Sequence, residues 1–274
     1  MAARTILSPT SGFIREAGFT HSLTPARNCT FGCSYCYVPT MRLQGGLQPA
    51  DWQRWGQFTT FKENAPELLA RQLRPEQIIY CSPLVDPYQP AETAERLVPR
   101  LLAVLAERPP RRFVLQTRGT LIRRDIELLR QVPGLRVSFS LTTNRDEVRR
   151  LFEPHCATFE QRLETMRALR EAGVDVWATL APLLPCDPEV LAQAALEATG
   201  RDLVGDPLHV RAVKPRGATT RDAALRIIEH HGFQPYLDPA AQAELVQRIA
   251  QVAAAHGRQF LTGPAGFSLL SQVD

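Results

Sequence analysis

The middle of the chain alternates short apolar runs with segments whose apolar residues recur at helical spacing. The short runs are rich in β-branched and aromatic residues, as buried strands are, whereas Leu97, Leu101 and Leu105 repeat along one face of a helix. The pattern predicts strands at residues 21–24, 77–82, 112–117, 135–141, 174–180 and 207–213. It predicts helices at residues 65–73, 91–106, 121–131, 145–151, 158–172 and 188–198.

The order of these elements, strand then helix about six times, predicts the fold class. Strands separated by helices form a parallel sheet with the helices outside it. About six β/α units, rather than eight, predict an α/β fold with a partial (β/α)6 barrel. A single domain over 1–274 would hold a barrel core at about 20–215 and an extension at about 216–274. The extension would carry helices at 221–231 and 240–256 and an apolar run at 259–262 that covers an edge or the barrel floor.

Composition limits the class and location of the protein but does not indicate a particular chemistry. The 274 residues carry a formal net charge of +4 and are 44% hydrophobic, which is ordinary for a globular protein. No apolar run approaches the roughly 18 residues that span a bilayer, and the first residues lack the apolar core of a secretion signal. We therefore expect a cytoplasmic protein with no membrane partner. The mild positive charge permits a nucleic-acid partner without requiring one, and the oligomeric state stays open.

Three of the six cysteines, Cys29, Cys33 and Cys36, fall within eight residues. Closely spaced thiols in a cytosolic protein indicate a metal site rather than a disulfide framework, and thiolates suit iron–sulfur clusters or zinc. Three ligands leave one iron of a 4Fe–4S cluster open for chemistry, whereas a structural zinc site needs a fourth ligand, for example His21 or a distant cysteine. Gly32 lies inside the trio, where a missing side chain would let the backbone pass close to the metal.

The segment at 28–37, with Tyr35 before its third cysteine, resembles the CxxxCxxC signature of the radical S-adenosylmethionine superfamily. The resemblance implies a 4Fe–4S cluster on Cys29, Cys33 and Cys36, with S-adenosylmethionine as second cofactor. In that superfamily one electron from the reduced cluster breaks the C5′–S bond of S-adenosylmethionine. The 5′-deoxyadenosyl radical then takes a hydrogen atom from the substrate. A reducing partner of the flavodoxin or ferredoxin type is also implied.

A second set of segments resembles the spore photoproduct lyase-like group of this superfamily, whose members are often called DNA repair photolyases. Residues 82–92 resemble its DPYQPxE signature, and residues 116–118, 137–143, 151–154 and 181–185 continue in register. The resemblance covers roughly residues 20–190 and fades toward the C-terminus. It implies a lyase-like radical enzyme whose substrate is unknown and could be a DNA lesion.

The resemblance assigns roles to residues at the carboxyl ends of strands, where a β/α barrel builds its site. Ser82 and Asp86 would lie near the methionine part of S-adenosylmethionine. Arg118, beside Thr117, replaces the group's usual lysine and would keep a cation near the cofactor's carboxylate. Simpler interpretations stay open, because Asp86 could begin a turn and Arg118 could pair with Asp125 on the next helix.

Further roles follow from the same resemblance. Ser140 would contact the amino-acid or ribose part of the cofactor, although it could instead only satisfy hydrogen bonds at a strand end. The backbone around Tyr35 and Tyr37 would hold adenine. Cys81 ends the second strand, where a cysteine of spore photoproduct lyase returns a hydrogen atom to the product radical, so it is the candidate catalytic residue. In a regular strand, however, an inward Ser82 would turn Cys81 outward into the core.

Other functions stay open at this point. The same chemistry could modify a peptide, an RNA or a small metabolite, and the chain could instead be a non-catalytic iron–sulfur or zinc binding module. Cleavage of S-adenosylmethionine by the reduced protein separates these classes. The aromatic stretch at 52–61 could stack nucleic-acid bases or pack its loop against the barrel. The remaining cysteines, Cys156 and Cys186, fit buried packing positions.

Overall fold

A computed structural model describes residues 1–40, 49–211 and 219–273 of the chain. Its centre is a sheet of eight strands in the order β1-β2-β5-β6-β7-β8-β9-β10. The strands are β1 (Leu7–Pro9), β2 (His21–Leu23), β5 (Ile78–Cys81), β6 (Arg112–Thr117), β7 (Leu135–Ser140), β8 (Asp175–Leu183), β9 (Leu203–Pro207) and β10 (Phe260–Thr262). All neighbours from β2 to β10 pair in parallel, and only β1 runs antiparallel. The predicted α/β fold with a partial barrel is confirmed.

One detail of the strand prediction is wrong. The strand predicted at 207–213 is β9 at Leu203–Pro207, because Leu203 and Val204 fill the core beside β8, whereas Leu208 and Val210 are buried outside the sheet. Residues 212 and 213 lie outside the described residues, as does the predicted boundary at 215–216. The apolar run at 259–262 joins the sheet as β10, in parallel with β9, so it covers an edge of the sheet, which was one of the two predicted positions.

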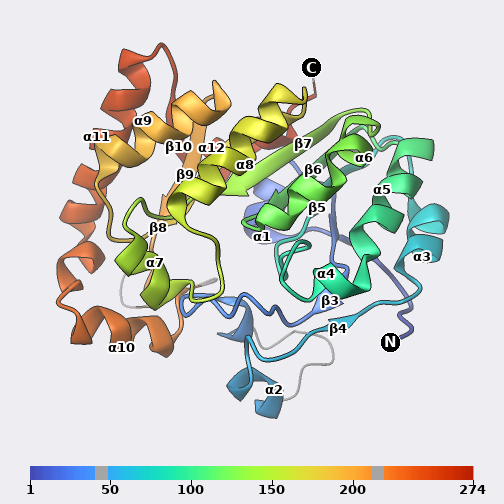
Figure 1. Cartoon of the computed structure of the whole chain (residues 1–274), viewed down its shortest axis with the longest axis horizontal. Coiled ribbons are helices and arrows are strands. Elements are labelled where there is room, and N and C mark those ends of the chain that lie inside the picture. The colour runs from blue at the N-terminus through green and yellow to red at the C-terminus, as the bar shows by residue number, and fades with distance from the viewer. Residues whose placement is uncertain (41–48, 212–218, 274) are drawn as a thin grey trace.

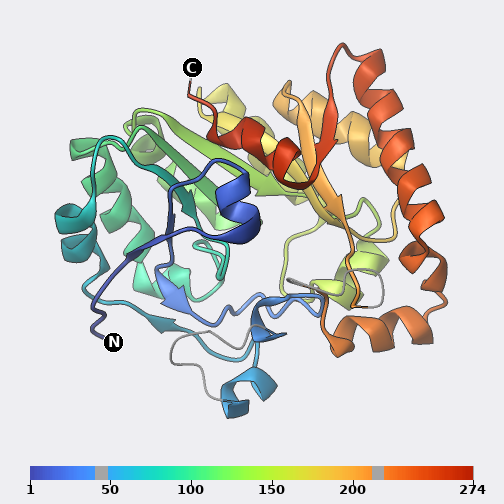
Figure 2. The same cartoon turned by 180° about the vertical axis from the view of Figure 1, so that it is seen from behind.

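Helices cover both faces of the sheet. One face carries the larger set (Figure 1): α3 (Ala65–Gln72), α4 (Glu92–Glu95), α5 (Leu97–Glu107), α6 (Ile126–Arg130), α8 (Phe159–Glu171), α9 (Pro188–Thr199) and α11 (Pro239–Ala255). The opposite face carries α1 (Gly12–Glu16) and α12 (Gly263–Ser271), as Figure 2 shows. The predicted helix at 91–106 is divided, because Arg96 adopts a left-handed φ of 52° and the Glu92 carboxylate accepts the first N–H groups of α5.

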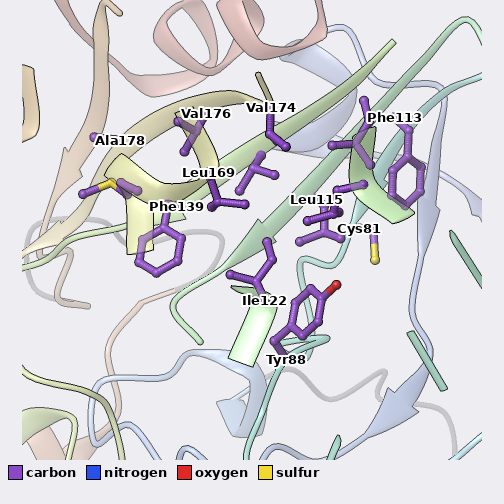
Figure 3. Packing of buried hydrophobic residues seen from close by; sticks show 14 of the residues in the cluster. Cys81, Tyr88, Phe113, Leu115, Ile122, Phe139, Leu169, Val174, Val176 and Ala178 are labelled. Atoms are coloured by element: carbon purple, nitrogen blue, oxygen red, sulfur yellow. The ribbon is translucent and has the colours of Figure 1, made fainter. Parts of the chain in front are cut away.

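Alternation along the strands separates two cores. Ile79, Cys81 and Leu115 point toward the larger set of helices and form the outer core with residues of α3, α5, α8 and α9 (Figure 3). Tyr80 and Val114 point the other way and form the inner core with residues of α1 and α12. The inner face of the sheet is therefore apolar where Tyr80 and Val114 pack against α1 and α12.

The remaining short elements lie beyond one end of the sheet (Figure 1). They are the ribbon of β3 (Ala26–Arg27) and β4 (Thr60–Phe61) and the helices α2 (Pro49–Gln53), α7 (Asp146–Phe152) and α10 (Asp222–His230). The short turns are η1 (Val38–Thr40), η2 (Thr120–Asp125) and η3 (Gln234–Leu237), of which η2 packs against α8 in the outer core. The chain between β3 and η1 holds the three closely spaced cysteines. Among the described residues, no helix is long and apolar enough to cross a membrane.

Candidate cluster and cofactor site

The cysteine loop, residues 28–37, is shaped by its own first residues and by a neighbouring glycine. Asn28 adopts a left-handed φ of 62°, and its Oδ1 accepts the Cys29 N–H at 2.7 Å and the Gly56 N–H at 3.4 Å. Gly32 is also left-handed, and a Cβ on Gly56 would lie 2.6 Å from the Gly32 Cα. Glycine is therefore required here by the backbone conformation and by the contact between the two glycines, a reason that the sequence did not reveal.

Gln89 ties the cysteine loop to the barrel. Its side chain is fully buried, and Oε1 accepts both the Thr30 N–H at 2.7 Å and the Thr30 hydroxyl at 3.2 Å. The Thr30 Oγ1 in turn accepts the Ala91 N–H at 3.2 Å. This glutamine belongs to the DPYQPxE segment, so part of that segment serves to hold the loop. Sequence reasoning singled out the segment and missed this role of Gln89.

The three thiols share one buried environment. Cys29 and Cys33 are buried and Cys36 is half-buried. Burial, followed by the charges of Asp86 and Cys33, raises the pKa of Cys29 well above its usual value. Burial, followed by the charge of Cys33, raises the pKa of Cys36 to about 12. In the cluster-free protein these two thiols are therefore protonated, and a metal must displace their protons.

Cys33 has two neighbours that favour its thiolate. A hydrogen bond from the Cys156 thiol is the largest influence that lowers the Cys33 pKa, and the Arg118 charge adds to it against the opposing effect of burial. Arg118 Nη1 lies 3.6 Å from the Cys33 Sγ, within hydrogen-bond distance for sulfur. Sequence reasoning favoured packing for Cys156 and named a distant cysteine only as the fourth ligand of the alternative zinc site, because nothing in the local pattern places Cys156 beside Cys33.

Arg118 is fixed by two carboxylates. Its Nη1 lies 2.6 Å from the Glu153 Oε1, and its Nε lies 3.9 Å from the Asp86 Oδ2. The same guanidinium donates to the Tyr35 hydroxyl, which donates to Glu153. The alternative pairing of Arg118 with Asp125 is wrong, because Asp125 is paired with the neighbouring Arg124.

Glu153 is the centre of this buried charge network. It is fully buried and also pairs with Arg162, which is itself 1% exposed. Burial alone would raise the Glu153 pKa, but the Arg162 and Arg118 guanidiniums outweigh it and lower the pKa to about 2. Glu153 therefore stays ionised and holds Arg118 beside the cysteine loop.

Asp86 and Thr117 bind each other at the ends of β5 and β6. The Thr117 hydroxyl donates to the Asp86 Oδ1 at 2.6 Å, and the same oxygen accepts the Tyr88 N–H at 2.9 Å. The Arg118 N–H donates to the Asp86 Oδ2 at 2.8 Å. Burial raises the pKa of Asp86 despite these donors. The turn-forming role of Asp86 is thus present, together with a bond that joins two strand ends near the loop.

The other predicted cofactor residues lie at nearby strand ends. The Ser82 Oγ lies 3.4 Å from the Thr24 Oγ1, and the Ser140 Oγ accepts the Gln116 side-chain N–H at 3.3 Å. The Tyr37 hydroxyl donates to the carbonyl of Pro83, next to Ser82.

The backbone carbonyls proposed for adenine binding have protein partners. The Tyr35 carbonyl accepts the Thr220 hydroxyl at 3.3 Å, and the Tyr37 carbonyl accepts the Thr40 N–H at 2.8 Å. Their roles toward a cofactor stay predictions.

Cys81 lies apart from this group. It is 3% exposed and packs in the outer core beside Leu115 and Tyr88 (Figure 3). Burial and then the Asp86 charge raise its pKa. Its side chain is on the opposite face of β5 from Tyr80, as the conflict between Cys81 and Ser82 anticipated. The position matches a packing residue, and the hydrogen-donor role stays a prediction that the position does not support.

Arg221 is a basic residue near the loop that sequence reasoning placed at the start of the predicted helix at 221–231. Its Nη1 is buried and has no hydrogen-bond partner among the described residues. Burial lowers the pKa of this guanidinium, against the opposing electrostatic influence of the Cys36 sulfur. The preceding Thr220 bonds to Tyr35, and Ala224 of α10 packs in the core that surrounds the cysteines. A half-buried cation with a buried, unpartnered Nη1 fits an anionic group at the loop.

The aromatic stretch at 52–61 packs against the loop. Trp55 is 7% exposed, and Phe58 and Phe61 contact the same core as Cys29. The side chain of Trp52 lies outside the described residues. The packing interpretation of this stretch is supported for Trp55, whose ring is not available for stacking on bases.

The match to known proteins agrees with this site. The model of the radical SAM superfamily matches residues 23–189, which is more than half of the chain. The chain belongs to the radical SAM superfamily. This radical SAM protein is 30% identical over 263 residues to the uncharacterised protein Rv2578c of Mycobacterium tuberculosis, a match that covers 86% of this chain and 74% of the relative.

A more distant relative comes from an archaeon. The uncharacterised protein MJ0683 of Methanocaldococcus jannaschii is 25% identical over 157 residues, which are 57% of this chain. The match spans 58% of that relative, less than two thirds of its length.

Solved structures of spore photoproduct lyase share the fold. A mutant with bound AdoMet and dinucleoside spore photoproduct superposes with a TM-score of 0.63 at 15% identity, over 95% of this chain and 80% of that chain. A second mutant gives a TM-score of 0.58 at 17% identity, over 87% of this chain and 78% of that chain. At such low identity the likeness shows a common fold.

Proposed function

We propose that this radical SAM protein is an enzyme that cleaves S-adenosylmethionine reductively, with a 4Fe–4S cluster held by Cys29, Cys33 and Cys36. The observation that carries the proposal is the loop of three thiols at the carboxyl ends of the strands, with Arg118 donating to Cys33. The donor set fits the group, because thiolates suit iron and three of them leave one iron free. When bound and reduced, the cluster supplies one electron that breaks the C5′–S bond and releases methionine and a 5′-deoxyadenosyl radical.

The protein's own residues would position and shield this chemistry. Asn28 and Gln89 hold the loop from two sides. Glu153 fixes Arg118, whose N–H group and charge favour the Cys33 thiolate. The buried surroundings of the loop exclude water from a reactive radical, which would then take a hydrogen atom from the substrate and leave as 5′-deoxyadenosine.

The binding of S-adenosylmethionine would use the polar strand ends. We assign the hydroxyls of Ser82 and Ser140 to direct contacts, because each has a single side-chain partner within the described part of the chain, and Arg118 to the cofactor's carboxylate. Asp86 and Thr117 bind each other, so we assign them to supporting these residues.

For the substrate we propose a DNA lesion of the spore photoproduct type. The support is the fold shared with a lyase whose structure holds AdoMet and dinucleoside spore photoproduct. The formal charge of +4 is compatible with a polyanion. We also propose an electron donor of the flavodoxin or ferredoxin type. Modification of a peptide, an RNA or a metabolite is the alternative if lesion substrates give no turnover.

The test begins with anaerobic reconstitution, which should yield about four iron and four sulfide per chain. Dithionite-reduced protein should then convert S-adenosylmethionine to 5′-deoxyadenosine and methionine, measured by mass spectrometry. The triple variant C29A/C33A/C36A should hold no cluster, whereas Cys186→Ala, which removes a buried thiol from the outer core, should hold a full one. Cluster-replete, reduced protein that forms no 5′-deoxyadenosine would show a binding module instead.

The substrate is tested separately with dinucleoside spore photoproduct that carries deuterium at the carbon that loses hydrogen. Deuterium in the recovered 5′-deoxyadenosine, together with repaired thymidines, would support the lesion. Formation of unlabelled 5′-deoxyadenosine without repair would keep the radical chemistry and reject this substrate.

A further inference from the structure

A fourth thiol lies beside the proposed cluster ligands. The Sγ atoms of Cys33 and Cys156 and a carboxylate oxygen of Glu153 all lie within 4.8 Å of one another. Cys33 is 7% exposed and Cys156 is 6% exposed, so this pair is almost enclosed. Both sulfurs belong to the core around the cysteine loop, together with Phe152.

The two chain segments that carry these thiols are joined by hydrogen bonds next to the sulfurs. The Ser34 N–H, one residue after Cys33, donates to the Phe152 carbonyl at 2.9 Å. On the other segment the Arg149 Nη1 donates to the Cys156 carbonyl at 2.8 Å. The Cys156 N–H donates to the Glu153 carbonyl at 3.1 Å. These bonds keep the two sulfurs as neighbours without help from a metal.

Among the described cysteines, Cys156 is the one whose sulfur is grouped with the Cys33 sulfur and a Glu153 oxygen within 4.8 Å. A disulfide needs a sulfur separation of about 2 Å, so the two sulfurs must approach each other from their positions within 4.8 Å.

We propose that Cys33 and Cys156 form a disulfide when the cluster-free protein meets a peroxide. Cys33 reduces hydrogen peroxide to water and becomes a sulfenic acid. The Cys156 sulfur then attacks the Cys33 sulfur, the S–O bond breaks, and a second water leaves with the Cys156 proton. Two thiols lose two electrons and two protons, and one peroxide gains them.

The disulfide would protect one proposed iron ligand, Cys33, in a form that can be reduced back to the thiol. Cys33 cannot bind iron while it is bonded to Cys156, and a dithiol reductant restores both thiols. Sulfenic acid that meets no second thiol proceeds to sulfinic acid, which is lost to metal binding. This consequence rests on the proposed cluster, whereas the disulfide itself does not.

Peptide mapping of the wild-type protein tests the bond directly. Cluster-free protein is treated with a few equivalents of hydrogen peroxide, alkylated and digested with trypsin. Cleavage after arginine places Cys29, Cys33 and Cys36 in peptide 28–42 and Cys156 in peptide 151–162. We expect the two peptides linked through Cys33 and a fall from six titratable thiols to four. A disulfide confined within peptide 28–42, or sulfinic acid at Cys33 without linkage, would overturn the proposal.

Variants connect the bond to cluster loading. After peroxide, wild-type protein should take up less than a tenth of its normal iron until dithiothreitol is added, and then all of it. Cys156→Ser should give no linked peptide and should not be rescued by dithiothreitol, while the matched Cys186→Ser should behave as wild type. Rescue of Cys156→Ser to the wild-type level would contradict the proposal. Failure of never-oxidised protein to bind iron would instead contradict the proposed function.

Discussion

Glu153 offers a quantitative test of the network beside the cysteine loop. The substitution Glu153→Gln keeps the shape of the side chain but removes the charge shared by Arg118 and Arg162. The Glu153 pKa is about 2 in the folded protein against a usual value of 4.5. This difference corresponds to about 3 kcal/mol of stability at neutral pH. Removal of one partner of a buried ion pair costs a similar amount, about 3–5 kcal/mol.

The pH dependence gives the same prediction a second readout. A carboxylate with a lowered folded-state pKa stabilises the fold fully above pH 4.5, and this contribution is lost as the pH falls through about 2. The difference in unfolding free energy between wild type and Glu153→Gln should therefore be about 3 kcal/mol at pH 7 and about half of that at pH 3. Urea unfolding of cluster-free protein at the two pH values measures both.

A surface pair provides the matched control. Glu160 pairs with Arg167 at 3.0 Å, but their side chains are 62% and 41% exposed, so Glu160→Gln should cost less than about 0.5 kcal/mol. The reasoning is refuted if Glu153→Gln costs no more than Glu160→Gln at pH 7, because the Arg118 and Arg162 charges would then be satisfied without Glu153.

Three further predictions concern the loop and its surroundings. Gln89→Ala should lower the free energy of unfolding by about 1–3 kcal/mol and reduce the iron retained after gel filtration, because Thr30 loses its acceptor. Gln89→Glu keeps an acceptor oxygen and should retain the iron. Equal iron in the two variants would contradict this prediction. Arg221→Gln should make the reduction potential of the cluster-loaded protein more negative, because a nearby cation favours the reduced cluster. A shift on the order of 59 mV corresponds to a tenfold smaller ratio of reduced to oxidised cluster at a fixed potential. A potential that is unchanged in spectroelectrochemical titration would show that this cation does not act on the cluster. Cys81→Ala should cost about 1 kcal/mol in urea unfolding and leave the products unchanged, and altered products would restore the donor role.

The sequence by itself determined the fold class and predicted the chemistry of the loop. Alternation of strand and helix periods is a local property, so the parallel order of β5 to β8 could be predicted with small errors in bounds. The spacing of Cys29, Cys33 and Cys36 is local as well, and it predicted the three cluster ligands, which stay a prediction within the matched range of residues 23–189. Even the orientation of Cys81 followed from alternation, because a strand turns successive side chains to opposite faces.

Only the tertiary structure decided which polar groups meet beside that loop. Tyr35 and Glu153 are 118 residues apart in the chain, and Cys156 and Arg221 also reach the loop from distant elements. The boundary of β9 depended on which apolar residues fill the core beside β8. No local pattern encodes such contacts, because they follow from the order of strands in the sheet and from the need of each buried charge for a partner.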